Sequence, residues 1–291
     1  MTKIFPYFLA LLFLSVSSFV HAACTVIDDA GHSIHLAKPA ARIISLAPDI
    51  TETLFAIGAG HQVVAVIGGS DYPSAARSLP SVGSYSGVDL EKIVALHPDL
   101  IVTWSYAFAR QLAALKTFGI AVYTTKPQQL EDIPRTMKNL GCLAGAEKSA
   151  NQAAEQFAAR LARLRRNYQA KKEITVFYQI GSYSLMTINK DSWINQAITL
   201  CGGRNLFAGS KTIAPEVSWE AVISANPQVI INSAADETWQ ARWQKWPEIT
   251  AVKNHLLFSI HPDLIERAGP RVLDGVQQIC LSLQQARELL M

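Results

Sequence analysis

Two glutamates, Glu91 and Glu220, occupy matching places in a sequence unit that the chain uses twice. The first copy is Val88–Val102 (VDLEKIVALHPDLIV) and the second is Val217–Ile231 (VSWEAVISANPQVII), with valine, glutamate and proline at one constant offset. A carboxylate in the first turn of a helix is stabilised by the helix dipole, by about 0.3–1 kcal/mol. That explains each glutamate alone but not their repetition, which is the best functional clue in the sequence.

Each copy also predicts the same local structure. A capping residue, Asp89 or Ser218, precedes a short helical segment that stops at a proline, and a run of buried β-branched residues follows. A unit that recurs only once, far along the chain, indicates two similar lobes rather than a solenoid, which needs several stacked copies. Each lobe therefore carries one glutamate in an equivalent helix.

The residues give little support to hydrolytic or metal chemistry. Gly83–Gly87 (GSYSG) has Tyr85 where a hydrolase nucleophile would stand. The histidines are scattered, with no H-E-x-x-H motif and no i, i+4 pair, so a metal site would need distant residues. An exported enzyme acting on a chelate or a sugar is the alternative from another class, although no nucleophile or acid–base pair can be placed. A structural adaptor that holds a membrane partner without a ligand is a third reading.

Aromatic side chains lie in or beside the loops that follow predicted strands. They are Tyr72, Tyr85, Trp104, Tyr106 and Tyr183. In open α/β sheets ligands bind at the carboxyl ends of the strands. Two facing lobes would form a cleft with flat apolar walls, which suits a large ring-shaped ligand. The alternative is that these rings, Trp104 above all, pack in the core.

Polar side chains follow the last predicted strand, residues 255–260. Asp263 and Arg267 could hydrogen-bond amides or a phosphate of a ligand. The competing account is a local ion pair that caps the final helix, which is predicted over residues 271–290.

Strands and helices alternate at short intervals, which predicts βαβ units. We therefore expect an α/β fold with two similar lobes, each a mostly parallel sheet flanked by helices. Residues 146–171 give the longest helical pattern and contain no Gly or Pro. We expect this helix to join an N-terminal lobe, 23–145, to a C-terminal lobe, 172–291. Lobe closure should be small because a continuous helix resists bending.

Residues 1–22 have the features of a signal peptide: Lys3 in a short positive region, an apolar core and an A-x-A-like end. We therefore expect export to the periplasm. Lipid anchoring through Cys24 is the alternative, but His21 stands where lipoprotein signals usually carry Leu or Val. The formal net charge of +3 is too small to predict nucleic acid as a partner. A monomer is expected.

The four cysteines of an exported chain face an oxidising compartment, and none lies in a C-x-x-C pair. Cys24 and Cys142 flank the first lobe, and Cys201 and Cys280 flank the second. A bridge within each lobe would leave the lobes free to move, whereas cross-lobe bridges would clamp them. We favour Cys201–Cys280 first and Cys24–Cys142 second, because a free thiol or acylation could claim Cys24. Buried unpaired thiols are the alternative.

Five segments carry a family resemblance: Arg42–Pro48 (RIISLAP), Ser70–Pro73 (SDYP), Leu90–Leu100 (LEKIVALHPDL), Cys201–Phe207 (CGGRNLF) and Glu266–Arg271 (ERAGPR). With them the chain resembles the periplasmic substrate-binding proteins of ABC importers whose lobes are joined by one long helix. The resemblance covers essentially everything after the signal peptide. Within that class the chain looks most like the members that bind cobalamin.

The resemblance implies a non-enzymatic receptor that captures a corrinoid and hands it to the permease dimer and ATPase of an inner-membrane importer. Glu91 and Glu220 match glutamates that dock into arginine pockets of the permease. Tyr85 stands where the family has a ligand-stacking tryptophan, and Trp104 matches another. The remaining matches are two polar ligand contacts and one disulfide: Asp263, Arg267, Cys201 and Cys280. No cofactor of the protein's own and no direct bond to a metal are expected.

The chain departs from the family pattern at two aromatic positions. Gly69 stands where the compared member has a ligand-contacting tyrosine, and Ala214 where it has a tryptophan. A haem or iron-siderophore receptor of the same importer class is therefore the nearest alternative.

Overall fold

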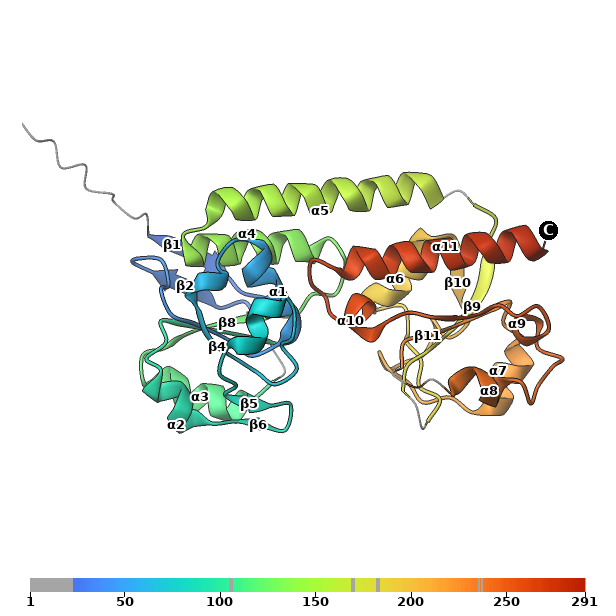
Figure 1. Ribbon diagram of the computed structural model, residues 1–291, viewed down its shortest axis with the longest axis horizontal. Coiled ribbons are helices and arrows are strands. Elements are labelled where there is room, and N and C mark those ends of the chain that lie inside the picture. The colour runs from blue at the N-terminus through green and yellow to red at the C-terminus, as the bar shows by residue number, and fades with distance from the viewer. Residues whose placement is uncertain are drawn as a thin grey trace, which may run out of the picture.

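The computed structural model describes residues 23–104, 107–168, 171–181, 184–234, 236 and 238–290. The expected signal peptide and two of the loop aromatics, Tyr106 and Tyr183, lie outside these ranges. Two α/β lobes stand side by side, and the long helix α5 (Glu147–Tyr168) passes from one to the other (Figure 1). The predicted fold class is confirmed.

The N-terminal lobe is built on a parallel sheet with the strand order β4-β3-β7-β8. Its strands are β3 (Ile43–Ser45), β4 (Val63–Val66), β7 (Leu100–Trp104) and β8 (Ala121–Thr125). Its helices are α1 (Pro48–Ala56), α2 (Leu90–Ala95), α3 (Ala109–Thr117) and α4 (Asp132–Ala144), with 3-10 turns η1 (Gly60–Gln62) and η2 (Ser74–Ser78). Two antiparallel hairpins complete it: β1 (Cys24–Ile27) with β2 (Ser33–Leu36), and β5 (Gly83–Ser84) with β6 (Gly87–Val88).

The C-terminal lobe repeats this architecture with a parallel sheet in the order β10-β9-β11-β12. Its strands are β9 (Ile174–Gln179), β10 (Gly203–Asn205), β11 (Val229–Asn232) and β12 (Leu257–Ser259). Its helices are α6 (Trp193–Leu200), α7 (Trp219–Ala225), α8 (Trp239–Trp243), α9 (Thr250–Lys253), α10 (Pro262–Ile265) and α11 (Val272–Leu290). Strands β3 and β11 are buried along their whole length, and each consists of β-branched apolar residues up to a final polar one, Ser45 or Asn232.

The repeated unit forms the same succession of elements in the two lobes. The Asp89 side chain accepts a hydrogen bond from the backbone N–H of Lys92 at the start of α2, and Ser218 does the same for Ala221 at the start of α7. A residue with φ of 45° stands just before the proline in each copy: His97, which follows the C-cap Leu96 of α2, and Asn226, which is the C-cap of α7. The left-handed residue turns the chain into the next buried strand. The predicted cap, helix, stop and strand are all present in both copies.

Helix α5 is held against both lobes by an apolar stripe. Its inward residues are Ala150, Ala154, Phe157, Leu161 and Leu164, and they belong to one apolar core that continues into both sheets. An ion pair adds to this packing: Arg160 Nη1 of α5 lies 2.7 Å from Asp274 Oδ1 of α11. Bending this helix would therefore separate packed side chains at both of its ends.

Each lobe contains its own disulfide. Cys24 of β1 is bonded to Cys142 of α4, and Cys201 at the end of α6 is bonded to Cys280 of α11. These are the two pairings favoured from the sequence, and neither links the lobes. Because the sulfur of Cys24 is bonded to Cys142, it is not free to carry a thioether-linked lipid, which argues against lipid anchoring at this residue.

Candidate functional site

The segments that follow β3 and β12 meet between the lobes. Helix α1 begins just after β3, and α10 begins just after β12. Figure 1 shows these two helices on facing sides of the lobes. The backbones meet closely here, because a Cβ atom added at Gly269 would lie 3.2 Å from the carbonyl oxygen of Asp49. A ligand site at the carboxyl ends of the strands therefore lies between the lobes.

The N-terminal lobe contributes an aromatic platform to this region. Tyr85, at the tip of the β5–β6 hairpin, is 62% exposed. Its ring centroid lies 6.1 Å from that of Trp104, and the ring planes differ by 23°. Trp104 is half-buried at the end of β7. The structure thus brings these two predicted residues together, with Tyr85 presenting its ring to solvent rather than to the core.

Asp49 fixes the orientation of the Trp104 indole, one of the two rings of this platform. Trp104 Nε1 donates a hydrogen bond to Asp49 Oδ2 at 3.2 Å. Burial raises the pKa of the Asp49 carboxyl to about 6, against the opposing effect of the indole N–H. The other carboxylate oxygen, Oδ1, is buried and has no hydrogen-bond partner. The sequence interpretation missed this residue, although an acidic group in the first turn after a strand and a proline is a usable signal.

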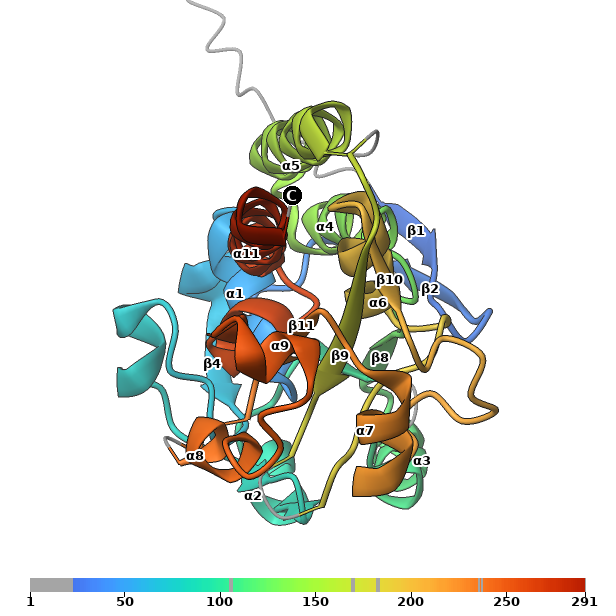
Figure 2. The same ribbon diagram turned by 90° about the vertical axis from the view of Figure 1, so that its right-hand side faces the viewer.

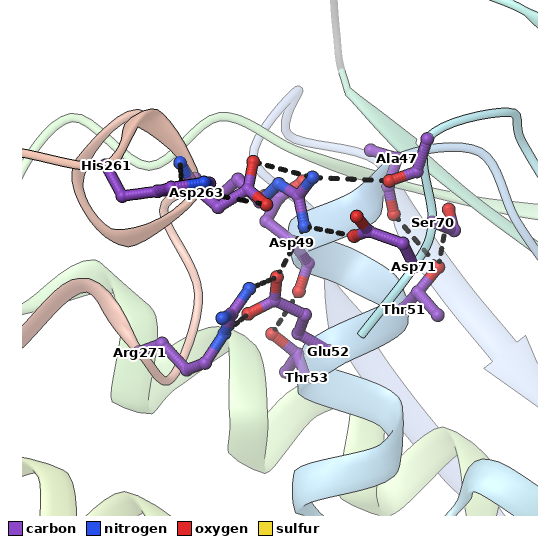
Figure 3. A network of polar contacts seen from close by, with 12 residues as sticks. Ala47, Asp49, Thr51, Glu52, Thr53, Ser70, Asp71, His261, Asp263 and Arg271 are labelled. Atoms are coloured by element: carbon purple, nitrogen blue, oxygen red, sulfur yellow. Dashed lines mark hydrogen bonds and ion pairs between the residues drawn. The ribbon is translucent and has the colours of Figure 1, made fainter. Parts of the chain in front are cut away.

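Arg267 joins the lobes instead of projecting into open space. Its guanidinium lies 2.9 Å from Glu52 Oε1, 2.9 Å from Asp71 Oδ1 and 2.8 Å from Asp263 Oδ1. Glu52 and Asp71 belong to the N-terminal lobe and Asp263 to α10, as Figure 3 shows. Arg267 Nη2 also donates to the carbonyl oxygen of Gly69 at 3.3 Å. The local ion pair with Asp263 is therefore one part of a larger interlobe cluster.

The same cluster includes Arg271 and Tyr72. Arg271 binds Glu52 in a two-pronged manner, with Nε 2.8 Å from Oε2 and Nη2 2.6 Å from Oε1. Its guanidinium carbon stands 3.8 Å from the centroid of the Tyr72 ring. These residues line a cavity of about 310 Å³ formed by both lobes. Tyr72 thus stacks on an arginine at the lobe junction, a cation–π contact that the sequence did not predict.

Backbone geometry explains one departure from the family pattern. Gly69 has φ of 86°, which side-chain-bearing residues adopt reluctantly. A tyrosine at this position would require a different path for the loop after β4. The loop is fixed instead by a hydroxyl cluster, in which Thr51 Oγ1 lies 2.8 Å from Ser45 Oγ and 3.2 Å from Ser70 Oγ.

The C-terminal lobe contributes an apolar wall. A pocket of about 400 Å³ follows the end of β9 and reaches the start of α6. Its described lining is Ile180, Gly181, Met186, Ile188, Ser192, Trp193, Ile194, Ile213, Ala214 and Glu266. The small side chain at Ala214, the second departure from the family pattern, leaves this space open. In the sequence, Ala214 was noted as a departure from the family pattern and Glu266 as the first residue of ERAGPR. The other lining residues were not grouped, because the lining comes from five separate segments.

Glu91 and Glu220 lie on the outer face of the molecule. Both are exposed, and their helices α2 and α7 stand one on each lobe, on the side opposite α5 (Figures 1 and 2). Hydrogen bonds from its own backbone N–H and from Ser218 lower the pKa of Glu220. Within the described ranges no ion pair engages either carboxylate. Two unpaired charges therefore face outward from equivalent points.

Within the described residues, none of the helices is both long and apolar enough to span a bilayer. No group of three or more His, Cys, Asp or Glu side chains in those ranges is arranged to hold a metal ion.

Comparison with known proteins decides the family. A family model described as periplasmic binding protein matches residues 43–264. The chain belongs to the periplasmic binding protein family. Relatives in it include the vitamin B12-binding proteins of Vibrio cholerae, 35% identical over 268 residues (91% of this chain and 97% of that protein), and of Pectobacterium atrosepticum, 36% identical over 255 residues (84% and 89%). The family is one of binding proteins and not a class of enzymes.

Two solved structures share the fold. The periplasmic vitamin B12 binding protein BtuF of Vibrio cholerae matches with a TM-score of 0.79 at 36% identity, over 86% of this chain and 99% of that one. The periplasmic heme binding protein HutB of the same organism matches with a TM-score of 0.74 at 22% identity, over 83% and 98%. At that lower identity the likeness concerns the fold alone.

Proposed function

We propose that this protein is a periplasmic receptor that captures a corrinoid between its lobes and delivers it to an ABC importer of the inner membrane. The observation that carries the proposal is the aromatic platform of Tyr85 and Trp104, set at the interlobe end of one sheet with an apolar wall at the facing end of the other. Such walls suit a broad ring system with a polar edge. Relatives of about 35% identity that are named for vitamin B12 binding support the same ligand.

The docking part of the proposal rests on Glu91 and Glu220. One exposed carboxylate on each lobe, at equivalent helix starts and on one face, matches a permease made of two equivalent subunits with two basic pockets. The cleft and the docking face then have separate roles. In this scheme residues 23–145 and 172–291 form the two lobes, residues 146–171 form the connecting helix, and residues 1–22 are the signal peptide that is removed. The receptor acts as a monomer. We assign no catalysis to it.

The test is titration of the purified protein with cyanocobalamin, haemin and a ferric hydroxamate, followed by calorimetry and by absorbance. We expect one corrinoid per chain with a sub-micromolar Kd and no comparable binding of the other two ligands. The absorbance of protein isolated from its native compartment should likewise be that of a corrin. Tight binding of haem or of the siderophore, without binding of the corrinoid, would replace the ligand and retain the receptor.

The alternative of a haem or siderophore ligand has a specific basis. Gly69 and Ala214 stand where the compared cobalamin-binding member has aromatic side chains, so two ring contacts to a ligand are absent in this chain. One observation weighs against it. Relatives of about 35% identity are named for vitamin B12 binding, whereas the heme binding protein HutB matches at 22% identity. We therefore place the corrinoid first.

A further inference from the structure

Four tryptophans gather in the outer part of the C-terminal lobe. Trp239 and Trp243 are buried, whereas Trp219 and Trp246 are half-buried. The rings of Trp219 and Trp246 are stacked, with their centroids 4.5 Å apart and their planes 24° from parallel. The Trp219 ring also lies 4.7 Å from that of Trp243. The inner two rings therefore fill the core, and the outer two, which we call the indole pair, form a fixed surface.

The indole N–H groups separate this pair from the other tryptophans of the chain. Four of the six tryptophans donate an indole hydrogen bond within the protein: Trp104 to Asp49, Trp193 to Ile265, Trp239 to Ser259 and Trp243 to Gln179. In the part of the chain that the structure describes, neither indole of the pair has such an acceptor. Half-exposed tryptophans with unused donors are typical of interfaces, where they supply rigid contact area.

The pair stands beside one of the two outward glutamates. Trp219 is the first residue of α7 and directly precedes Glu220, and Figures 1 and 2 show α7 and α8 at the end of the lobe away from α5. In the first copy of the repeated unit the residue before Glu91 is Leu90, which is also half-buried. A carboxylate and the face of an indole both attract a cation. A guanidinium is the cation that can pair with the first and stack on the second.

We propose that the indole pair receives an arginine side chain of the permease subunit that docks at Glu220, so that the C-terminal docking point binds more tightly than the N-terminal one. The inference rests on the proposed function, in which Glu220 meets a basic pocket. The guanidinium stacks on Trp219 while it pairs with the carboxylate. Because Trp243 and Trp246 already hold the Trp219 ring, stacking on it costs little side-chain freedom. Leu90 offers no aromatic face, so the two docking points are unequal.

The experiment measures the Kd of the mature protein for its permease dimer and ATPase in lipid nanodiscs. Trp219→Leu, which gives the second unit the type of residue found in the first, should weaken binding about fivefold, or about 1 kcal/mol. Trp219→Phe should weaken it less, because phenylalanine keeps an aromatic face and leucine does not. Tyr168→Leu removes a half-buried aromatic ring of α5, away from the docking face, and should leave the Kd unchanged.

Two further measurements isolate the contact. In a Glu220→Gln background, Trp219→Leu should cost less than in the wild type, because one guanidinium engages both side chains. The Kd for cyanocobalamin should be the same in all these variants, which shows that the lobes remain folded. Hydroxyl-radical footprinting of the wild type should show Trp219 and Trp246 protected from oxidation by the importer in nanodiscs and not by empty nanodiscs.

The contrary outcomes are distinct. A Trp219→Leu variant that binds the importer as tightly as the wild type, or equal losses in the leucine and phenylalanine variants, would overturn the inference and leave docking by the glutamates intact. Protection by empty nanodiscs would assign the pair to the lipid surface, where tryptophan also partitions, and protection on concentrating the protein alone would assign it to a second copy of this chain; either result overturns the inference. Importer binding that survives reversal of Glu91 and Glu220 to arginine would overturn the proposed docking and this inference with it.

Discussion

Glu52 is the centre of the contact between the lobes, so its removal tests whether that contact holds them together. Its side chain is only 1% exposed and is shared by Arg267 and Arg271, whose side chains are 15% and 21% exposed. All three bonds are charge-assisted, at 2.6–2.9 Å. The perturbation is Glu52→Ala, with Arg271→Ala and the double variant completing a mutant cycle.

The expected magnitude follows from burial. Removing one partner of a buried ion pair costs about 3–5 kcal/mol, because the other charge is left uncompensated. Here the two arginines retain some access to water, and Arg267 keeps Asp71 and Asp263. We therefore expect Glu52→Ala to lower the free energy of unfolding by about 2–4 kcal/mol. The coupling energy of Glu52 with Arg271 should be about 1.5–3 kcal/mol, the usual range for bonds to charged groups.

The assay is urea unfolding followed by tryptophan fluorescence, with small-angle scattering to report whether the lobes separate in the native variant. The exposed pair Arg204–Glu173, with the two atoms 2.7 Å apart and side chains 53% and 59% exposed, is the control and should couple by about 0.2–1 kcal/mol. A coupling energy for Glu52 and Arg271 no larger than the control, with unchanged scattering, would refute the reasoning that this cluster joins the lobes.

Four further outcomes are expected. Trp104→Ala should weaken corrinoid binding in calorimetry by about tenfold, because stacking contributes about 0.5–1.5 kcal/mol beyond the buried area. Reversing Glu91 and Glu220 together to arginine should abolish permease association and uptake while ligand affinity stays unchanged. Cys280→Ser should lower the free energy of unfolding by about 2–5 kcal/mol. Because burial raises the pKa of Asp49 to about 6, the folded state holds this proton more tightly than the unfolded chain, whose pKa is about 3.9. Stability contributed by protonated Asp49 is therefore present below about pH 4 and is lost as pH rises through about 6, a slope that Asp49→Asn should remove.

Each of these has a contrary outcome. Unchanged affinity of the Trp104 variant would place the ligand elsewhere. Normal transport by the charge-reversed double variant would reduce both glutamates to helix-end stabilisation, with Glu155→Arg on the exposed surface of α5 as the control. A serine variant at Cys280 as stable as the wild type would mean that the bridge adds nothing to the fold. Equal pH dependence of wild type and the Asp49 variant would contradict the raised pKa.

The architecture was predictable because it depends on local and repeated signals. Alternating apolar runs and helix caps specify the βα units, and the doubled unit at 88–102 and 217–231 specified two lobes. The capping roles of Asp89 and Ser218 followed directly, since a cap acts over three residues. Both disulfides could be favoured because the pairs flank the two halves of the chain. Short strands such as β10 escaped notice, because a three-residue strand that begins with one glycine and follows another carries almost no periodicity.

The chemistry of the interlobe region depended on the tertiary structure. Arg267 meets Glu52 across 215 positions of sequence, and no pattern in one chain marks so distant a partner. The carboxyl of Asp49 is perturbed only because folding removes it from water and places the Trp104 indole against it. Composition and spacing determine which residues a lobe can bury, since burial of apolar runs is a local preference summed along the chain. Which charges then face one another is decided by how two separately folded surfaces meet.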